Sequence, residues 1–306
     1  MRRAFVRAIE ALADRDPRVV VLTGDLGFEM FERFIARHGP RYVNVGIAEA
    51  QLVTAAAGLA LEGFRPFVYS IAAFLTGRAY EQIRVALAYH RLPVVLVGAG
   101  GGYCYASSGV THHAPDDLAL MSLLPGMTVA APGDPNEVEA LLPQLLALDG
   151  PAYLRIGKSG EPAYEAPSPV VLGTARLLRA GRRVAILTSG EMAPTALAAR
   201  ETLAGTGIEP EVWQFHTVKP IDTATLDRLA SRFQGLLVVE ESSPPGGLGS
   251  VVAAWHSGLA GARPRLVRLG PKDEFALGSL KRETLRHRWG YDAQSVAETC
   301  RDLWNA

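Results

Sequence analysis

Short apolar, β-branched runs alternate along this chain with alanine-rich stretches that have helical spacing. Strands separated by helices of ten or more residues favour parallel βαβ units, and a continuously apolar strand is typical of a sheet covered on both faces. We therefore predict an α/β fold built on a parallel sheet. The expected strands of its first part lie at 19–25, 64–71, 92–100, 127–134 and 151–156, with helices expected at 77–90 and 135–148.

The same alternation restarts after residues 157–173, a stretch that is dense in glycine, proline and serine. Such composition is typical of a connection between domains, and a chain of 306 residues has room for two. We place a first domain at 1–160, a linker at 161–173 and a second, smaller α/β domain at 174–306.

The charges of the chain balance, with 31 Lys and Arg against 31 Asp and Glu. No net field draws it to nucleic acid or to an acidic membrane, so we expect neither as a partner. No apolar run approaches the roughly 18 residues of a membrane span. The N-terminal residues 1–16 indicate an amphipathic helix, not a signal peptide, and two cysteines make no disulfide framework. These features predict a cytoplasmic protein.

One carboxylate stands at the beginning of the apolar stretch VNVGIAEAQLVTAAAGLALEG, residues 43–63. On a helix, residues three and four apart share a face, so this glutamate falls on the stripe that the core should cover. A buried glutamate needs a partner. From position alone, an arginine elsewhere in the chain or the dipole of the helix start would serve. The stripe comprises Glu49, Leu52, Val53, Ala56, Ala57 and Ala60.

This stretch, continued to FRPFV, resembles the pyrimidine-binding domain of thiamine-diphosphate enzymes of the transketolase and deoxyxylulose-phosphate-synthase group. Further motifs similar to that group follow in its order: YSIAAFLTGRAYEQIR, GVTHHAPDDLALM, LPGMTVAAPGDPNEV and PAYLRIGKSG. FHTVKPID and EESSPPGGLGSVV resemble the C-terminal domain of the group. The resemblance covers essentially the whole chain, and it implies a parallel-sheet pyrimidine-binding domain followed by a smaller C-terminal α/β domain.

The resemblance also implies a role for Glu49. In the family this glutamate hydrogen-bonds a ring nitrogen of the aminopyrimidine and so helps to activate the thiazolium carbon. Burial among apolar residues should raise the pKa of the carboxyl and keep a proton available. Phe74 matches the aromatic residue that stacks on the aminopyrimidine, and Ile71 takes a nearby place where relatives often have another aromatic. A plain core aromatic is the alternative for Phe74.

The glycine-rich loop at 98–117 borders the substrate channel in the family. It lacks the full spaced fingerprint of a dinucleotide site. His112 matches the histidine that contacts substrate oxygen and assists proton transfer, as suits a pKa near working pH. A metal at the His pair would need a better third ligand than the two aspartates that follow it. Ser108 stands where transketolases have an aspartate that binds a sugar hydroxyl, and this departure leaves the stereochemistry of the acceptor open. Arg155 matches the later phosphate-binding arginine of the family, and the resemblance implies a small sugar or sugar-phosphate substrate.

Asp25, in TGDLG, lies at the end of a predicted strand, where α/β sites form. The family places this segment beside the thiazolium, and a helix cap or loop acid is the alternative. The Gly-Asp-Gly…Asn pattern that holds the diphosphate of the cofactor through Mg²⁺ does not occur in these 306 residues. We therefore expect a separate diphosphate-binding subunit that supplies most of the Mg²⁺ ligands, in an α₂β₂ assembly.

These inferences together predict the C-terminal subunit of a split transketolase-like enzyme. It would transfer a two-carbon ketol unit from a ketose to an aldehyde through thiamine diphosphate. Two alternatives stay open. One is a decarboxylating relative, either a deoxyxylulose-phosphate-synthase-like protein or a 2-oxoacid dehydrogenase β subunit. The other is a non-catalytic subunit that retains the fold.

Overall fold

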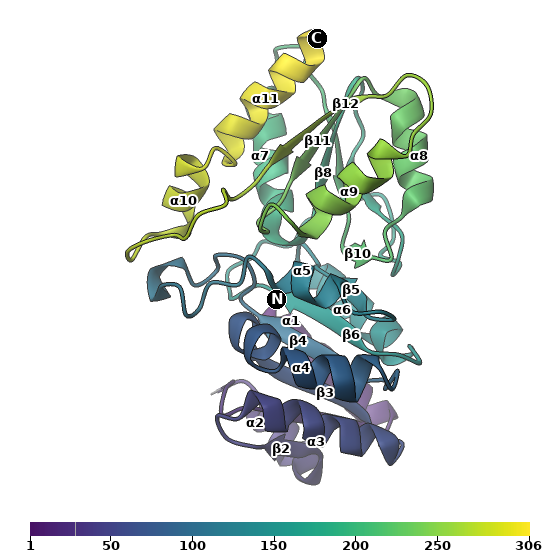
Figure 1. Ribbon diagram of the computed structural model, residues 1–306, viewed down its shortest axis with the longest axis vertical. Helices are drawn as coiled ribbons and strands as arrows, with labels where there is room; N and C mark the ends of the chain where they lie inside the picture. The colour runs from purple at the N-terminus through teal and green to yellow at the C-terminus, as the bar shows by residue number, and fades with distance from the viewer. Residues whose placement is uncertain (28) are drawn as a thin grey trace.

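The computed structural model describes residues 1–27 and 29–306, which form two α/β units lying one above the other along the long axis of the molecule (Figure 1). The first unit is built on a seven-stranded sheet in the order β10-β5-β6-β4-β3-β1-β2. All neighbours are parallel except β10, which is antiparallel to β5. The strands are β1 (Val19–Thr23), β2 (Tyr42–Asn44), β3 (Arg65–Ile71), β4 (Val95–Ala99), β5 (Thr128–Ala130), β6 (Ala152–Ile156) and β10 (Thr217–Lys219).

Helices cover both faces of this sheet, and each face has its own apolar cluster. One face packs against α1 (Arg2–Arg15), α2 (Glu32–His38) and α6 (Pro135–Leu146), through side chains such as Phe5 and Leu141. The other packs against α3 (Glu49–Leu61), α5 (Asp117–Ser122) and the helical segment at 74–88. Alternate residues of β1 enter opposite clusters, which explains its unbroken apolar sequence.

The helix predicted at 77–90 is wrong in its detail, because two π-helical turns, Phe74–Arg78 and Ile83–Ala88, flank a short α4 (Tyr80–Gln82). Apolar spacing indicates which side of a helix is buried. It does not determine whether each backbone N–H donates to the carbonyl four residues earlier, as in an α-helix, or five residues earlier, as in a π-helix. The segment still buries Leu75, Ile83 and Leu87 on one side. Such π turns occur frequently at functional sites.

The second unit is a five-stranded sheet in the order β12-β11-β8-β9-β7, parallel except for the pair of β7 with β9. Helices α7, α10 and α11 cover one face, and α8 and α9 cover the other. The elements are β7 (Arg176–Arg179), β8 (Val184–Thr188), α7 (Ala193–Thr202), β9 (Glu211–Gln214), α8 (Thr223–Arg232), β11 (Gly235–Val239), α9 (Gly247–Ser257), β12 (Arg265–Leu269), α10 (Arg282–Arg288) and α11 (Ala293–Asn305).

The two units are tied together by β10, which lies in the sequence of the second unit but adds to the sheet of the first. Its neighbour His216 accepts a backbone hydrogen bond from Ala131 at 2.7 Å. The pairing with β10 supplies hydrogen-bond partners for backbone groups of β5 that would otherwise form an unpaired edge. No helix among the described residues has the length and apolar character to cross a membrane.

Candidate active site

Glu49 is the first residue of α3, and the residue is buried, with a relative exposure of 4%. The helix buries the stripe that the sequence predicts: Glu49, Leu52, Val53, Ala56, Ala57 and Ala60. The two carboxylate oxygens accept hydrogen bonds from Nη1 of Arg78 at 3.3 and 3.2 Å. The buried glutamate therefore has an arginine partner, which is one of the alternatives that its position left open.

Arg78 belongs to the same π-helical turn as Phe74. Its guanidinium carbon lies 4.1 Å from the centre of the Phe74 ring. A guanidinium is planar and weakly hydrated, so it stacks on an aromatic face while its edge N–H groups stay available to a carboxylate. The guanidinium of Arg78 thus contacts both the Phe74 ring and the Glu49 carboxylate.

The imidazole of His112 lies against the same phenyl ring, with 5.0 Å between the ring centres of Phe74 and His112. Its Nδ1 is 2.9 Å from the hydroxyl of Thr111. The fold thus brings Glu49, Phe74 and His112 together, although they come from segments that follow three different strands, β2, β3 and β4. Ligands of open parallel sheets bind outside the carboxyl ends of the strands, as this cluster would allow.

Asp25 follows β1 at the same end of the sheet, with a left-handed backbone at φ 57°. Its backbone N–H donates to Oδ1 of Asn44 at 3.0 Å, and Nδ2 of Asn44 donates back to the Asp25 carboxylate at 3.1 Å. The same Oδ1 accepts the N–H of Gly46, so Asn44 joins this turn to the one that leads into α3. A non-glycine residue that hydrogen bonds to its neighbours hold in a strained backbone conformation is typical of functional sites. Ile71 is the last residue of β3 and is partly buried.

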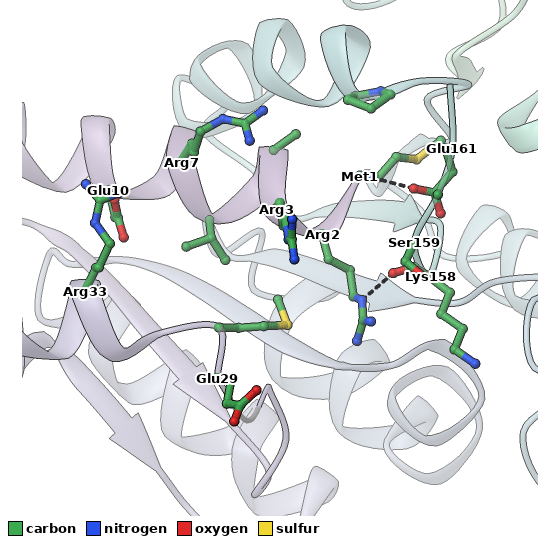
Figure 2. Close-up of a pocket in the computed structure, with 15 residues that line it drawn as sticks. Met1, Arg2, Arg3, Arg7, Glu10, Glu29, Arg33, Lys158, Ser159 and Glu161 are labelled. Carbon is green, nitrogen blue, oxygen red and sulfur yellow. Dashed lines mark hydrogen bonds and ion pairs between the residues drawn. The ribbon is translucent and has the colours of Figure 1, made fainter. Parts of the chain in front are cut away.

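The sequence did not reveal a pocket rich in cationic side chains, a cavity of about 900 Å³ that Figure 2 shows. The cations that line this cationic pocket are Arg2, Arg3, Arg7, Arg33 and Lys158. Arg2 donates to the backbone carbonyl of Lys158, and Nζ of Lys158 lies 4.8 Å from the ring centre of Tyr105. The Tyr105 ring in turn is 5.9 Å from that of His112. A continuous row of contacts therefore connects the pocket with the cluster around Phe74.

Several carboxylates line the same pocket, but most of them are already paired. Glu161 binds the N-terminal ammonium at 2.6 Å, and Glu10 pairs with Arg33 at 3.4 Å. Among the described residues, Arg2 and Lys158 have no carboxylate within 4.0 Å. The sequence signals for this pocket are the basic start MRR and the lysine of GKSG, which lie too far apart in the chain to suggest contact.

Two other predicted site residues lie outside this cluster. Arg155 is buried in β6, where its guanidinium is hydrogen-bonded to Asp117, to the carbonyls of Ala114 and Glu241 and, at 3.4 Å, to the hydroxyl of Ser242. Substrate binding by Arg155 stays a prediction, and this set of protein acceptors counts against it. Ser108 is exposed in a short 3₁₀ turn that faces residues 276–279 of the second unit.

Behind the glycine-rich loop, an ionic cluster fills the contact between the units. Burial opposes the ionisation of Glu241, but the guanidinium groups of Arg282 and Arg286 hold its pKa well below the usual range. Glu241 also accepts the backbone N–H of Tyr103 at 2.9 Å. Because this contact crosses the two units, the cluster fixes the loop that carries His112.

The structure brings no metal site together in the part of the chain that it describes: no group of three or more His, Cys, Asp or Glu side chains could hold an ion. His113 is buried instead, with Nε2 3.0 Å from the carbonyl of Ala106. Cys104 donates to Glu191 at 2.6 Å, and burial raises the pKa of its thiol well above the usual value. A thiol held in this state is a poor nucleophile.

Comparison with protein-family models gives two matches, the transketolase pyrimidine-binding domain over residues 1–161 and the transketolase C-terminal domain over residues 173–296. The 6-deoxy-6-sulfo-D-fructose transketolase subunit of Clostridium sp. (strain MSTE9) is 36% identical over 99% of this chain and 94% of its own length. The 1-deoxy-D-xylulose-5-phosphate synthase 2 of Geobacter sulfurreducens is also 36% identical, but the chain spans only 48% of it.

Among solved structures, the chain is similar to a split-gene transketolase described as an inactive β4 tetramer. The TM-score is 0.88 and the identity 33%, over 99% of this chain and 97% of that one. The chain therefore has nearly the length of the split subunits, and about half the length of the synthase that it matches.

Proposed function

Because the chain belongs to the transketolase family and is homologous to the C-terminal subunits of split transketolases, we propose that it is such a subunit. It would transfer a two-carbon ketol unit from a ketose donor to an aldehyde acceptor. The observation that carries the proposal is the meeting of Glu49, Phe74 and His112 at the carboxyl ends of neighbouring strands.

The space between Phe74 and Glu49 suits the aminopyrimidine of thiamine diphosphate. A flat group with edge N–H donors already fits there, namely the guanidinium of Arg78. An aminopyrimidine has the same features, a π face for Phe74 and a polar edge for the carboxyl group of Glu49. Bound thiamine diphosphate supplies a nucleophilic carbon that makes the bond next to a ketose carbonyl cleavable.

Each residue of the chain then has a role towards cofactor and substrate. Glu49 holds a ring nitrogen of the cofactor and Phe74 stacks on the ring, while Ile71 and Asp25 border the cofactor. His112 moves protons at the substrate oxygens, with Thr111 fixing the orientation of its imidazole. General acid–base catalysis by a positioned histidine contributes about 10²–10⁴-fold.

The far end of the substrate would lie in the cationic pocket, held by Arg2 and Lys158. Two cations without carboxylate partners favour an anionic terminal group, such as a phosphate or a sulfonate. The relative named for 6-deoxy-6-sulfo-D-fructose has a substrate with such a group. This assignment gives Arg2 and Lys158 the role that the sequence suggested for Arg155.

A partner subunit would hold the diphosphate of the cofactor and Mg²⁺, in an α₂β₂ assembly in the cytoplasm. Two observations support the need for a partner. The chain is similar to a transketolase subunit over 94% of the length of that subunit, and the similar split-gene β4 tetramer is described as inactive.

The alternative is a decarboxylating enzyme, which the identity with a 1-deoxy-D-xylulose-5-phosphate synthase favours. A donor assay separates the two proposals. A complex that accepts a ketose donor but not pyruvate supports the transketolase, and the reverse supports the decarboxylating enzyme.

The experiment that tests the proposed site uses the complex of this chain with its partner. Glu49→Gln should fold like the wild type and lose at least about 10²-fold in turnover. The matched control is Glu62→Gln, which removes an exposed carboxylate just after the same helix. Turnover by Glu49→Gln close to that of Glu62→Gln would exclude a catalytic role for this carboxyl group and favour a non-catalytic subunit.

A further inference from the structure

Arg78 makes two contacts that the proposed function assigns to the cofactor. Its guanidinium lies 4.1 Å over the Phe74 ring and donates to both oxygens of Glu49. A guanidinium and an aminopyrimidine are both flat and polar at the edge, and the single face of Phe74 next to Glu49 has room for one of them. The two groups therefore compete for one place.

The exposure of the two partners shows which of them can move. The side chain of Glu49 is 3% exposed, whereas that of Arg78 is 51% exposed. The carboxylate is fixed at the first turn of α3, but the arginine can rotate outward into solvent with no change of backbone. Its departure alone would leave a buried carboxylate without a partner, which is strongly unfavourable.

We propose that Arg78 is a built-in substitute for the aminopyrimidine, a further inference that rests on the proposed function. In the cofactor-free chain it covers Phe74 and satisfies the buried carboxylate of Glu49. When the cofactor enters, the guanidinium leaves and the aminopyrimidine takes over both contacts. The pyrimidine-binding site is thus closed by the chain's own side chain until the cofactor replaces it.

The guanidinium of Arg78 in this position should lower the affinity of the site for the aminopyrimidine. The apparent affinity of a site that is open for only a fraction of the time falls by that fraction. Removing the guanidinium should therefore strengthen pyrimidine binding while it weakens the cofactor-free fold. A residue that only stabilises the fold would not produce both effects, and a residue that holds the cofactor would produce the opposite effect on binding.

The first test measures binding to the full chain without a partner, with 4-amino-5-hydroxymethyl-2-methylpyrimidine as the probe in an NMR titration. Arg78→Met keeps the length of the side chain and removes its N–H groups, and Arg84→Met changes an exposed arginine of the same segment as the control. We expect Arg78→Met to bind the probe about tenfold more tightly than the wild type or Arg84→Met. Unchanged or weaker binding by Arg78→Met would overturn the proposal.

The second test is a double-mutant cycle on the melting temperature of the cofactor-free chain. Arg78→Met should lower the melting temperature, and Glu49→Gln in the same chain should restore most of the loss, because the neutral amide leaves no buried charge without a partner. Equal losses in both backgrounds would show that the pair does not interact and would refute the proposal. Arg78→Gln, which keeps an N–H donor for Glu49, serves if Arg78→Met does not fold.

The two proposals fail in different ways. If Glu49 and Arg78 are coupled in the melting experiment but no variant binds the probe, removal of Arg78 does not open a pyrimidine site, and the role of Arg78 is refuted. The proposed function is judged separately, by the turnover of Glu49→Gln in the complex with the partner. If the probe binds and Glu49→Gln inactivates the complex, but Arg78→Met does not strengthen binding, only the role of Arg78 is refuted.

Discussion

Substitution of Arg155 by methionine separates a substrate ligand from a structural cation. Arg155 is 7% exposed, and Asp117, with which its guanidinium pairs, is fully buried. Removing one member of a buried ion pair costs about 3–5 kcal/mol. Here Asp117 keeps two short hydrogen bonds, both 2.6 Å long, from the hydroxyl of Tyr153 and the N–H of Leu118. The lower limit, about 3 kcal/mol, is therefore the expected loss.

The same substitution also removes the two bonds from Nη1 to the second unit, 3.2 Å to the carbonyl of Glu241 and 3.4 Å to the hydroxyl of Ser242. At roughly 2–4 °C per kcal/mol for a large domain, the melting temperature should fall by about 6–12 °C. Scanning calorimetry of the purified chain measures this, with the exposed Arg301→Met as a control that should change the free energy of unfolding by less than about 0.5 kcal/mol.

Neutralising the orphaned carboxylate provides a second check. Asp117→Asn combined with Arg155→Met should recover part of the loss, because no buried charge remains unpaired. If Arg155→Met has the melting temperature of the wild type and raises only the KM for an anionic substrate, a structural role is refuted. Arg155 is then the anion ligand that the sequence suggested.

Three further outcomes follow from buried groups. Burial lowers the pKa of His216 to about 4, so the folded chain binds fewer protons than the unfolded chain between pH 4 and 6.5, and stability is lost as the pH decreases through this range. Relative to His216→Gln, the wild type should lose about 2 kcal/mol in denaturant unfolding between pH 7 and pH 5; a constant difference would contradict this. Gly98→Ala would place a Cβ in a steric clash with the hydroxyl of Tyr153 and should cost about 1–3 kcal/mol, whereas Gly58→Ala, with open space around it, should stabilise α3 by up to about 1 kcal/mol. Equal changes in the free energy of unfolding for the two variants would contradict this reasoning. Burial raises the pKa of Cys300 to about 12, so its thiol should react with a disulfide reagent at pH 8 only after denaturation. Fast labelling of Cys300 in the native chain would refute the buried, protonated state of this thiol.

The sequence alone determined most of the elements of the first unit and the buried side of α3. Short runs rich in apolar residues predicted the strands β1, β3, β4, β5 and β6, and the spacing of the apolar residues in α3 predicted that Glu49 faces the core. These inferences succeed because periodicity depends only on the geometry of the local backbone. The family motifs added the identities of Phe74 and His112, which the fold brings within 5.0 Å of each other, ring centre to ring centre.

Only the tertiary structure decided which groups lie opposite each other across the fold. It paired Glu49 with Arg78, directed Arg155 towards Asp117 and brought Arg2 to Lys158, 156 residues further along the chain. It also placed β10 in the first sheet. A buried charge and an unpaired sheet edge each require a partner, and the sequence shows that need. The choice of partner depends on how strands far apart in the chain align, which no local pattern specifies.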